Sequence, residues 1–346
     1  MNNWKDTLLF RALRQQPVPR PPIWLMRQAG RYLPEYRAIR KEAGGFLAMA
    51  KNPQIASEIT LQPIRRFGFD AAILFSDILT IPDAMGLGLF FSEGEGPRFS
   101  QPLQTEEAIQ KLRPASLEEL RYVMDASVLT RQTLPAETPL IGFCGSPFTL
   151  ACYMIDGSGG NFWRTRQMRF SRPDLLRRVL EINTISTAEL LCAQIDAGCQ
   201  AVMIFDSWGG LLGGDEYEDF SLSYIRHVVS LVKEKSDAPI IVFGRRCGLM
   251  LPALAACGCD AVGVDWQTSL RMARRMIGGK VAIQGNLEPA ALLGTPDIAA
   301  AAAARVLADY GDSSGHIFNL GHGVDKSTPP ECVTAVVETV RANRSH

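Results

Sequence analysis

Two arginines near the N-terminus stand where they could bind acid groups. Arg27 and Arg31 flank the small pair Ala29-Gly30, directly after the apolar run Pro22–Leu25. Glycine lets a ligand approach the backbone closely, and guanidinium groups match carboxylates with planar pairs of donors. If the apolar run is a strand, this segment predicts a pocket at the strand's end for a molecule that carries several carboxylates.

Other polar residues follow similar apolar runs further along the chain. They are Ser76 and Asp77, Gly145-Ser146, Asp206-Ser207, Arg245-Arg246, Asp265, Asn286 and Gly321-His322-Gly323. In a parallel sheet the carboxyl ends of all strands lie on one side. The pattern therefore predicts one rim that gathers most of the reactive side chains.

Eight short apolar runs, rich in Val, Ile and Phe, are predicted to be strands. They are Pro22–Met26, Ala71–Phe75, Leu140–Cys144, Ala201–Phe205, Ile240–Phe243, Ala261–Val264, Val281–Ile283 and Ile317–Leu320. Each run is continuous rather than alternating, which is typical of strands buried on both faces. Helical patterns separate most of them, at Pro53–Phe67, Leu117–Thr130, Asp174–Ala197, Glu216–Lys235 and Ile298–Tyr310. Repeated βα units with a parallel sheet follow from this order.

Eight such units favour closure into a (β/α)8 TIM barrel, with an open doubly wound sheet as the alternative. We expect residues 1–346 to form a single α/β catalytic domain whose active site lies at the carboxyl ends of the strands. Two glycine-rich segments, Gly86–Pro102 and Asp156–Arg169, interrupt the pattern. The first is predicted to be an excursion after the second strand and the second a mobile flap over the barrel mouth, with an ordinary surface loop as the alternative for both.

Composition excludes several classes of partner. The 36 basic and 36 acidic residues cancel, so no overall field favours nucleic acid. No apolar run approaches the roughly 18 residues of a membrane span, and the N-terminal residues predict neither a signal nor a transit peptide. The eight cysteines include no C-x-x-C pair and lie mostly in apolar segments, which predicts reduced thiols in a cytoplasmic protein.

Familiar cofactor chemistry is also missing from the sequence. The four histidines form neither H-x-H nor H-E-x-x-H, which argues against a common zinc hydrolase site. No lysine ends a strand cleanly, which argues against a Schiff base, and no G-x-G-x-x-G follows a strand. What is left is a barrel mouth that handles an organic polyacid without metal or coenzyme.

Two long motifs and four shorter ones resemble the uroporphyrinogen decarboxylase family. The long ones are Met26–Arg37 and Gly142–Gly157; the short ones are Thr60–Phe67, Phe75–Leu79, Gln284–Leu287 and Asn319–Gly323. The resemblance spans nearly the whole chain. It implies a single-domain barrel, usually a homodimer, that needs no cofactor. It also implies the decarboxylation of the four acetates of uroporphyrinogen III to methyls, which gives coproporphyrinogen III.

By motif position, the resemblance assigns substrate contacts to Arg27, Arg31, Asp77, Tyr153, Ser207 and His322, with the backbone of Gln28-Ala29-Gly30. Phe46 is expected to pack on the macrocycle. Arg245-Arg246 stands where many members have lysine, and Glu288 stands where aspartate is common. The geometry of any contact at Arg245 is therefore an open question.

The reaction needs an electron sink, and the pyrrole ring itself is the one available. Asp77 is expected to lie beneath the macrocycle, accept its N–H groups and stabilise a protonated pyrrole. The general acid is left open among Arg27, Tyr153, His322 and a water held by Asp77. Structural alternatives also exist: Asp77 as a helix cap, His322 in a turn, Tyr153 in the core. Asp206 and Asp265 are expected to order the rim.

Three rival functions fit parts of the pattern. A corrinoid-linked methyltransferase of the same superfamily would hold zinc with an H-x-C pair, yet Val229, Phe318 and Val324 follow the internal histidines at that spacing. A barrel glycosidase would use Asp206 and Glu288 as its acid pair. A tetrapyrrole-binding protein without catalysis would differ only in turnover.

Overall fold

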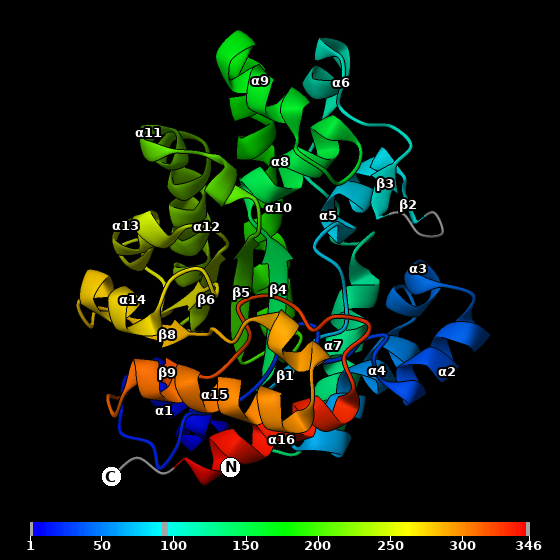
Figure 1. The fold of residues 1–346 in the computed structure, drawn as a ribbon. Helices are drawn as coiled ribbons and strands as arrows, with labels where there is room; N and C mark the ends of the chain where they lie inside the picture. Colours follow the sequence, from blue (N-terminus) through cyan, green and yellow to red (C-terminus); the bar gives the residue numbers. More distant parts are fainter. Residues whose placement is uncertain (1–2, 92–95, 344–346) are drawn as a thin grey trace.

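A parallel sheet forms the centre of the structure, a computed structural model that describes residues 3–91 and 96–343. Within these residues seven strands follow one another around the sheet in chain order (Figure 1). They are β1 (Ala72–Ile73), β4 (Leu140–Gly145), β5 (Ala201–Asp206), β6 (Ile240–Gly244), β7 (Ala261–Val264), β8 (Ala282–Gln284) and β9 (His316–Ile317). All neighbouring pairs are parallel, as the repeated βα units require.

The first predicted strand closes this sheet into a barrel, although it is reduced to a single bridge. Ile23 pairs in parallel with Phe318, whose N–H donates to the carbonyl of Pro22 at 2.9 Å. On the other side, the Asp70 N–H donates to the Ile23 carbonyl at 2.9 Å. The predicted run Pro22–Met26 is shortened because Pro22 has no N–H and the N–H of Met26 bonds instead to the side chain of Asn319. The predicted barrel is confirmed, and its first strand is shorter than predicted.

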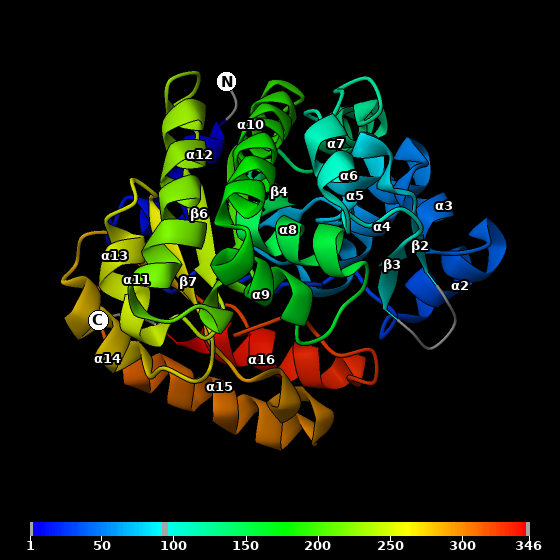
Figure 2. The same cartoon turned by 90° about the horizontal axis from the view of Figure 1, so that it is seen from above.

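Helices cover the outside of the barrel. The larger ones are α4 (Pro53–Phe67), α7 (Arg121–Thr133), α8 (Pro147–Asp156), α10 (Pro173–Asp196), α12 (Ser223–Lys233), α14 (Leu270–Ile277), α15 (Pro296–Tyr310) and α16 (Pro330–Ala342). Seen from above, α10 stands beside α12 and α15 runs along α16 (Figure 2). The prediction for Pro53–Phe67 matches α4, which begins after the capping side chain of Asn52.

Shorter helices and turns complete the fold. They are α1 (Leu8–Leu13), α2 (Pro34–Ala43), α3 (Phe46–Ala50), α5 (Thr80–Pro82), α6 (Glu106–Lys111), α9 (Trp163–Ser171), α11 (Gly214–Tyr217) and α13 (Leu251–Ala255). Single turns are η1 (Asn3–Asp6), η2 (Asp83–Leu87), η3 (Gly209–Leu211), η4 (Glu218–Leu222), η5 (Gly248–Met250) and η6 (Pro289–Leu293). The helix predicted over Glu216–Lys235 is therefore broken into α11, η4 and α12. The wide turn η4 follows Tyr217 and contains Ser221, and the hydroxyls of these two residues both donate to Asp206.

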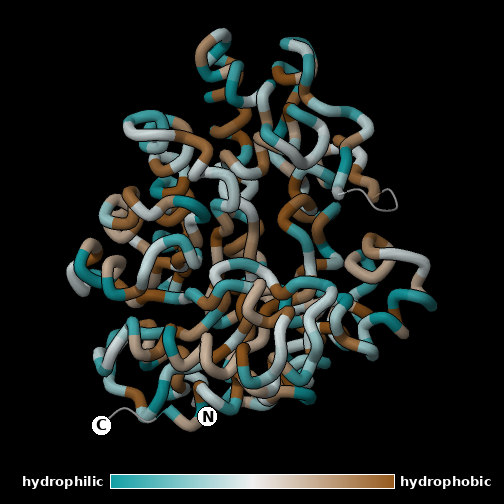
Figure 3. Tube along the Cα trace, in the orientation of Figure 1, coloured by the Kyte–Doolittle hydropathy of each residue, from teal (hydrophilic) through white to brown (hydrophobic). Residues whose placement is uncertain are grey.

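The strands are buried on both faces, as predicted. Ile141, Met203 and Ile241 belong to a cluster inside the barrel, and Leu9 and Phe10 of α1 join it. Alternate residues of the same strands pack outward into the larger cluster beneath the helices. Hydropathy along the chain shows the apolar segments gathered in the centre of the molecule (Figure 3).

The two glycine-rich segments differ in structure. Gly86–Pro102 contains the antiparallel pair β2 (Leu89–Phe91) and β3 (Pro97–Phe99), and residues 92–95 lie outside the described part. Asp156–Arg169 leads into α9, which projects at the top of Figure 1. Its movement as a flap stays a prediction. Along the described ranges, no helix is both long and apolar enough to cross a membrane.

Candidate active site

The first loop, residues 24–33, is held by the buried side chain of Gln28. Its amide donates to the Ala71 carbonyl at 3.2 Å and accepts from the Leu25 N–H at 3.0 Å. Its own N–H bonds to the Leu25 carbonyl, and its carbonyl accepts from the Tyr32 hydroxyl at 2.7 Å. The Gln28 side chain thus holds the loop in place, and contact of its backbone with a ligand stays a prediction.

Ala29 and Gly30 are different, because their N–H groups donate to no other described residue. They are half-buried and available to an anion. Arg27, with a φ of 59°, sends its side chain across Gly323, where an added Cβ would overlap the Cδ of Arg27. The N–H of Val324 bonds to the carbonyl of Met26 at 2.9 Å. The first and last loops of the barrel are therefore joined directly beside Arg27.

Asp77 follows β1 and keeps one carboxylate oxygen free. Oδ1 accepts from the Leu79 N–H at 2.8 Å, as a turn-forming aspartate does, whereas Oδ2 has no partner among the described residues. Burial raises the pKa of Asp77, and the Leu79 N–H and the Arg27 guanidinium oppose the rise. The side chain is half-buried. The capping alternative therefore accounts for only one of its two oxygens.

His322 lies at the end of the last barrel segment, near the guanidinium groups of Arg27 and Arg245. Burial lowers the pKa of His322 to about 3, with help from the guanidinium groups of Arg27 and Arg245. Its ring centroid lies 6.3 Å from that of Phe243. The imidazole is therefore neutral at pH 7 in the free protein, and a role for His322 as general acid requires a bound anion that raises its pKa.

Tyr153 projects from α8 into the same region. Its ring packs 5.2 Å from Phe162 and 6.3 Å from Trp208, between centroids. Burial raises the pKa of Tyr153, the Asp77 carboxylate adds to the rise, and Trp208 and Arg27 oppose it. The phenol is thus a neutral donor near both charged groups.

The remaining predicted residues lie further from this centre. Ser207 comes directly after β5, is half-buried, and its side chain makes no hydrogen bond to a described residue. Arg31 is exposed, and its charge opposes the rise that burial causes in the pKa of Tyr36. Phe46 begins α3 and packs 5.5 Å from the ring of Phe75, two residues before Asp77. A role in contact with a ligand stays a prediction for these three.

Asp206 and Asp265 order the rim. Asp206 is fully buried and accepts from the hydroxyls of Ser146 (2.6 Å), Thr149 (3.3 Å), Tyr217 (3.1 Å) and Ser221 (3.0 Å). Asp265, 2% exposed, accepts from the Arg246 N–H at 2.5 Å. Both carboxylates are engaged with the protein, so they position loops.

Arg245 joins the centre, a role that the sequence left open. It follows β6, and its charge helps to lower the pKa of His322. Tyr153 and Arg27 in turn affect the pKa of Arg245, which burial lowers. The signal in the sequence was its place directly after a strand.

Together these residues make a mouth with two cations, one carboxylate with a free oxygen, and neutral phenol and imidazole donors. The cations suit a ligand with several carboxylates, and the single carboxylate suits a cationic centre. No group of three or more His, Cys, Asp or Glu side chains in the described residues could hold a metal ion.

Solved structures share this fold. A methyltransferase from Methanosarcina mazei superposes with a TM-score of 0.79 at 21% identity, covering 96% of this chain and 97% of its own. A putative vitamin-B12 independent methionine synthase from Listeria monocytogenes gives a TM-score of 0.58 at 11% identity, covering 94% and 96%. At such identities the likeness establishes the barrel and no more.

Sequence relatives are much more similar. A uroporphyrinogen decarboxylase from Neisseria meningitidis is 53% identical over 340 residues, 97% of this chain and 96% of the relative. One from Legionella pneumophila is 54% identical over 343 residues, 98% and 97% of the two chains. The family model for uroporphyrinogen decarboxylase matches residues 5–343. The chain is therefore a member of the uroporphyrinogen decarboxylase family.

Proposed function

We propose that this protein removes the four acetate carboxyl groups of uroporphyrinogen III as carbon dioxide and releases coproporphyrinogen III, a step of porphyrin and haem biosynthesis. Its family supports this activity. The structural observation that carries the proposal is Asp77, whose Oδ2 is free beside Arg27 at the barrel mouth. The methyltransferase alternative lacks support, because the histidines are not followed by zinc-binding cysteines.

The pyrrole ring supplies the electron sink. Protonation of a ring carbon makes the pyrrole cationic, and loss of carbon dioxide then returns an electron pair to the ring and leaves an exocyclic methylene. A proton added at that methylene forms the methyl group, and the proton on the ring carbon is released. Asp77 accepts the pyrrole N–H groups and offsets the positive charge without being consumed. Opposite charges about 4 Å apart gain about 4 kcal/mol at a partly shielded site. A raised pKa, caused mainly by burial, marks a carboxylate whose charge is poorly solvated until such a cation forms.

The outer carboxylates of the substrate are held by the rest of the mouth. Arg27 and Arg31 supply charge, and the free N–H groups of Ala29 and Gly30 supply neutral donors. Tyr153, Ser207 and His322 add hydrogen-bond donors, and Phe46 offers an apolar face near the ring. Binding of eight carboxylates to this set orients each acetate in turn over Asp77.

The pKa values of His322 and Tyr153 bear on which group donates the proton. At about 3, the pKa of His322 leaves no proton to give from an imidazolium at neutral pH until bound carboxylates raise it. Tyr153 keeps its proton, because burial raises its pKa. Arg27, Tyr153, His322 and a water on Asp77 therefore stay the four candidates, and the arginine is the weakest acid among them.

We further propose a cofactor-free cytoplasmic homodimer. All eight cysteines are free, which fits a reducing compartment. Trp163 and Phe170 on α9 are 67% and 70% exposed, and they form an apolar surface that a second copy could cover. Light scattering of the wild type and of Trp163→Ser would test the dimer, which should weaken in the variant.

The activity is tested by anaerobic incubation with uroporphyrinogen III in the presence of a strong chelator, followed by chromatography of the oxidised porphyrins. We expect hepta-, hexa- and pentacarboxylates followed by a tetracarboxylate product. Release of no carbon dioxide, or loss of activity on metal removal, would contradict the proposal. Arg246→Met, at the exposed neighbour of Arg245, is the control variant and should keep its activity. Asp206→Ala is unsuitable as a control, because we expect the loss of four hydrogen bonds to destabilise the fold.

A further inference from the structure

A cation and an indole meet at the carboxyl ends of β6 and β5. The Cζ of Arg245 lies 5.4 Å from the centroid of the Trp208 ring, within the range of a cation–π contact. The Trp208 ring packs 4.8 Å from Phe162 and 6.3 Å from Tyr153, between centroids. This stack holds the guanidinium at a defined place in the barrel mouth.

The backbone beneath the pair is also held. The Arg245 N–H donates to the Asp206 carbonyl at 3.2 Å, and the next N–H, of Arg246, donates to Asp265. Gly210 lies against the carbonyl of Arg245 so closely that an added Cβ would overlap it. A loop with so many fixed contacts presents its side chain in a preorganised position.

Within the described residues, neither polar group makes an ion pair or a well-formed hydrogen bond. The Arg245 guanidinium makes no ion pair and no hydrogen bond to any described residue, although it is half-buried. Trp208 Nε1 is buried, lies next to the Tyr153 hydroxyl, and makes no well-formed hydrogen bond to any described residue. A desolvated cation and a buried donor without acceptors are unfavourable, and a bound anion would relieve both.

We propose that Arg245 and Trp208 Nε1 form a second carboxylate subsite, distinct from the first loop, that binds one side-chain carboxylate of the tetrapyrrole. The inference rests on the proposed function. Arg245 lies near Tyr153 and His322, so a carboxylate bound to it would lie in the same barrel mouth as Asp77. The guanidinium supplies charge and parallel donors, and the indole N–H supplies a third donor that fixes the angle of approach.

The main test compares Arg245→Met with Arg245→Lys in the full-length protein. Fluorescence titration with uroporphyrin, the oxidised octacarboxylate, should show a Kd about 10- to 100-fold higher for the methionine variant. The KM for uroporphyrinogen should rise with it while kcat changes less than threefold, and lysine should restore part of the affinity. A Kd within threefold of wild type, or a loss confined to kcat, would overturn the subsite.

Arg246→Met is the matched control, because it removes the same charge from the adjacent, exposed position. We expect its Kd to stay within threefold of wild type. An equal loss in both variants would mean that the effect is general electrostatics, and the subsite would be rejected.

The indole donor is tested by Trp208→Phe, which keeps the ring and removes the N–H. We expect a Kd about 3- to 10-fold higher with an unchanged melting temperature. Unchanged affinity would remove Trp208 from the subsite.

A measurement without substrate separates this inference from the proposed function. In the ligand-free protein, Arg245→Met should raise the pKa of His322, followed by NMR of the imidazole, because one of its two neighbouring cations is gone. The wild type could bind uroporphyrin more tightly than Arg245→Met does and yet release no carbon dioxide from uroporphyrinogen. That result would support the subsite and contradict the proposed function.

Discussion

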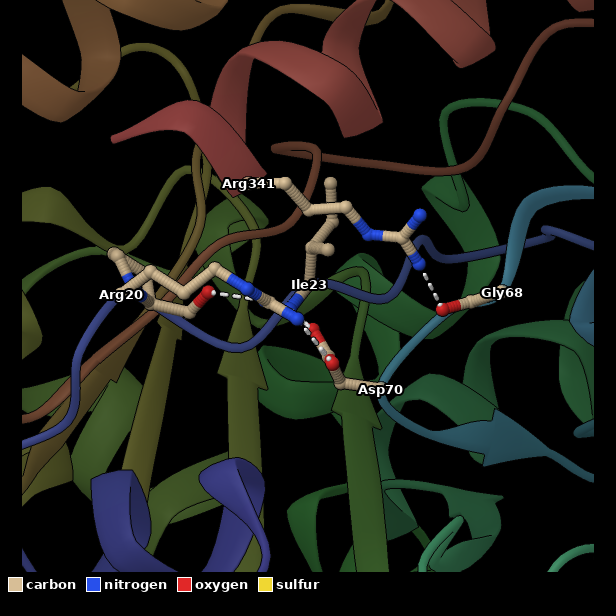
Figure 4. A network of polar contacts seen from close by, with 6 residues as sticks. Arg20, Ile23, Gly68, Asp70 and Arg341 are labelled. Atoms are coloured by element: carbon tan, nitrogen blue, oxygen red, sulfur yellow. Dashed lines mark hydrogen bonds and ion pairs between the residues drawn. The ribbon is translucent and has the colours of Figure 1, made fainter. Parts of the chain in front are cut away.

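The two ends of the barrel use charged residues in opposite ways. At the amino ends of the strands, Asp70 binds Arg20 through two hydrogen bonds of 2.7 and 2.8 Å and accepts the Ile23 N–H at 2.8 Å (Figure 4). Arg341 reaches across to the carbonyl of Gly68 at 2.5 Å. At the carboxyl ends, Asp77 keeps an oxygen free.

A second amino-end aspartate also pairs with a cation and a strand N–H, through one oxygen. Asp260 binds Lys233 at 2.8 Å and accepts the Ile240 N–H at 2.7 Å. Each of these carboxylates thus joins a cation to the start of a neighbouring strand. The carboxyl-end cations Arg27 and Arg245, in contrast, make no ion pair with any described residue.

The difference separates groups that hold the fold from groups that await a ligand. A carboxylate paired with a cation and a strand N–H contributes to stability, whereas a desolvated carboxylate without an ion pair costs stability until a ligand binds it. Substitutions at the two ends should therefore divide cleanly between effects on unfolding and effects on turnover.

The largest effect is expected for Asp77→Asn. Turnover should fall by about 10²- to 10³-fold, because the charge that stabilises the cationic pyrrole is lost. The fold should keep its stability or gain some at pH 7. Burial raises the folded-state pKa of Asp77, so the ionised group destabilises the protein as pH rises above its unfolded pKa, and the amide does not. Steady-state kinetics and thermal unfolding measure the two effects.

Near-wild-type turnover in this variant would contradict the role of Asp77. A large fall in melting temperature would instead place Asp77 with the structural aspartates of the amino ends.

Asp70→Asn should give the reverse result. It leaves Arg20 with a weaker partner, and we expect the free energy of unfolding to fall by about 1–3 kcal/mol. The kcat of the folded fraction should be unchanged, because Asp70 lies at the far end of the barrel. Urea denaturation and turnover per active site give both numbers. Loss of kcat without loss of stability would erase the distinction between the ends.

A smaller effect is expected for Gly323→Ala. The new Cβ would push the Arg27 side chain aside, so kcat/KM should fall by about tenfold. Stability should change little, because the displaced atoms belong to a flexible side chain. Gly213→Ala is the control, since nothing lies within 4 Å of a Cβ there. Equal kcat/KM values in the two variants would show that activity does not depend on the present position of the Arg27 side chain.

The sequence predicted the barrel well because its signals are local. Continuous apolar runs and glycines that end helices, such as Gly68 with its φ of 65°, specify the βα units without tertiary information. The first strand was predicted to be longer than it is. Its N–H groups bond to side chains, among them Asn319, that only the closed barrel brings near.

The site was predicted at the level of position and less well at the level of role. A strand-end aspartate looks the same in sequence whether four hydroxyls surround it, as at Asp206, or one N–H, as at Asp77. The backbone of Gln28 was assigned to the pocket with its neighbours, which stays a prediction, and nothing in the sequence indicated that its side chain holds the first loop. Arg245 could not be assigned, because its distance from Trp208 depends on two separate loops.

The most subtle expected effect concerns two histidines at opposite ends of the same barrel segment. Burial lowers the pKa of His316, at the amino end, to about 4, and it bonds to the Gly285 carbonyl at 2.8 Å. His322, at the carboxyl end, has a pKa of about 3 because burial acts together with two guanidinium groups. In the free protein neither imidazole should become protonated between pH 5 and 8.

Uroporphyrin should separate the two. Its carboxylates would neutralise Arg27 and Arg245, so the pKa of His322 should rise by about one unit or more, and that of His316 should not move. Imidazole NMR signals followed from about pH 7 down to about pH 3, with and without the porphyrin, measure this directly. A pKa near 6.5 for His322 in the free protein would contradict the arrangement of cations around it. An equal response of both histidines would mean that the ligand acts on the whole protein rather than at the carboxyl ends of the strands.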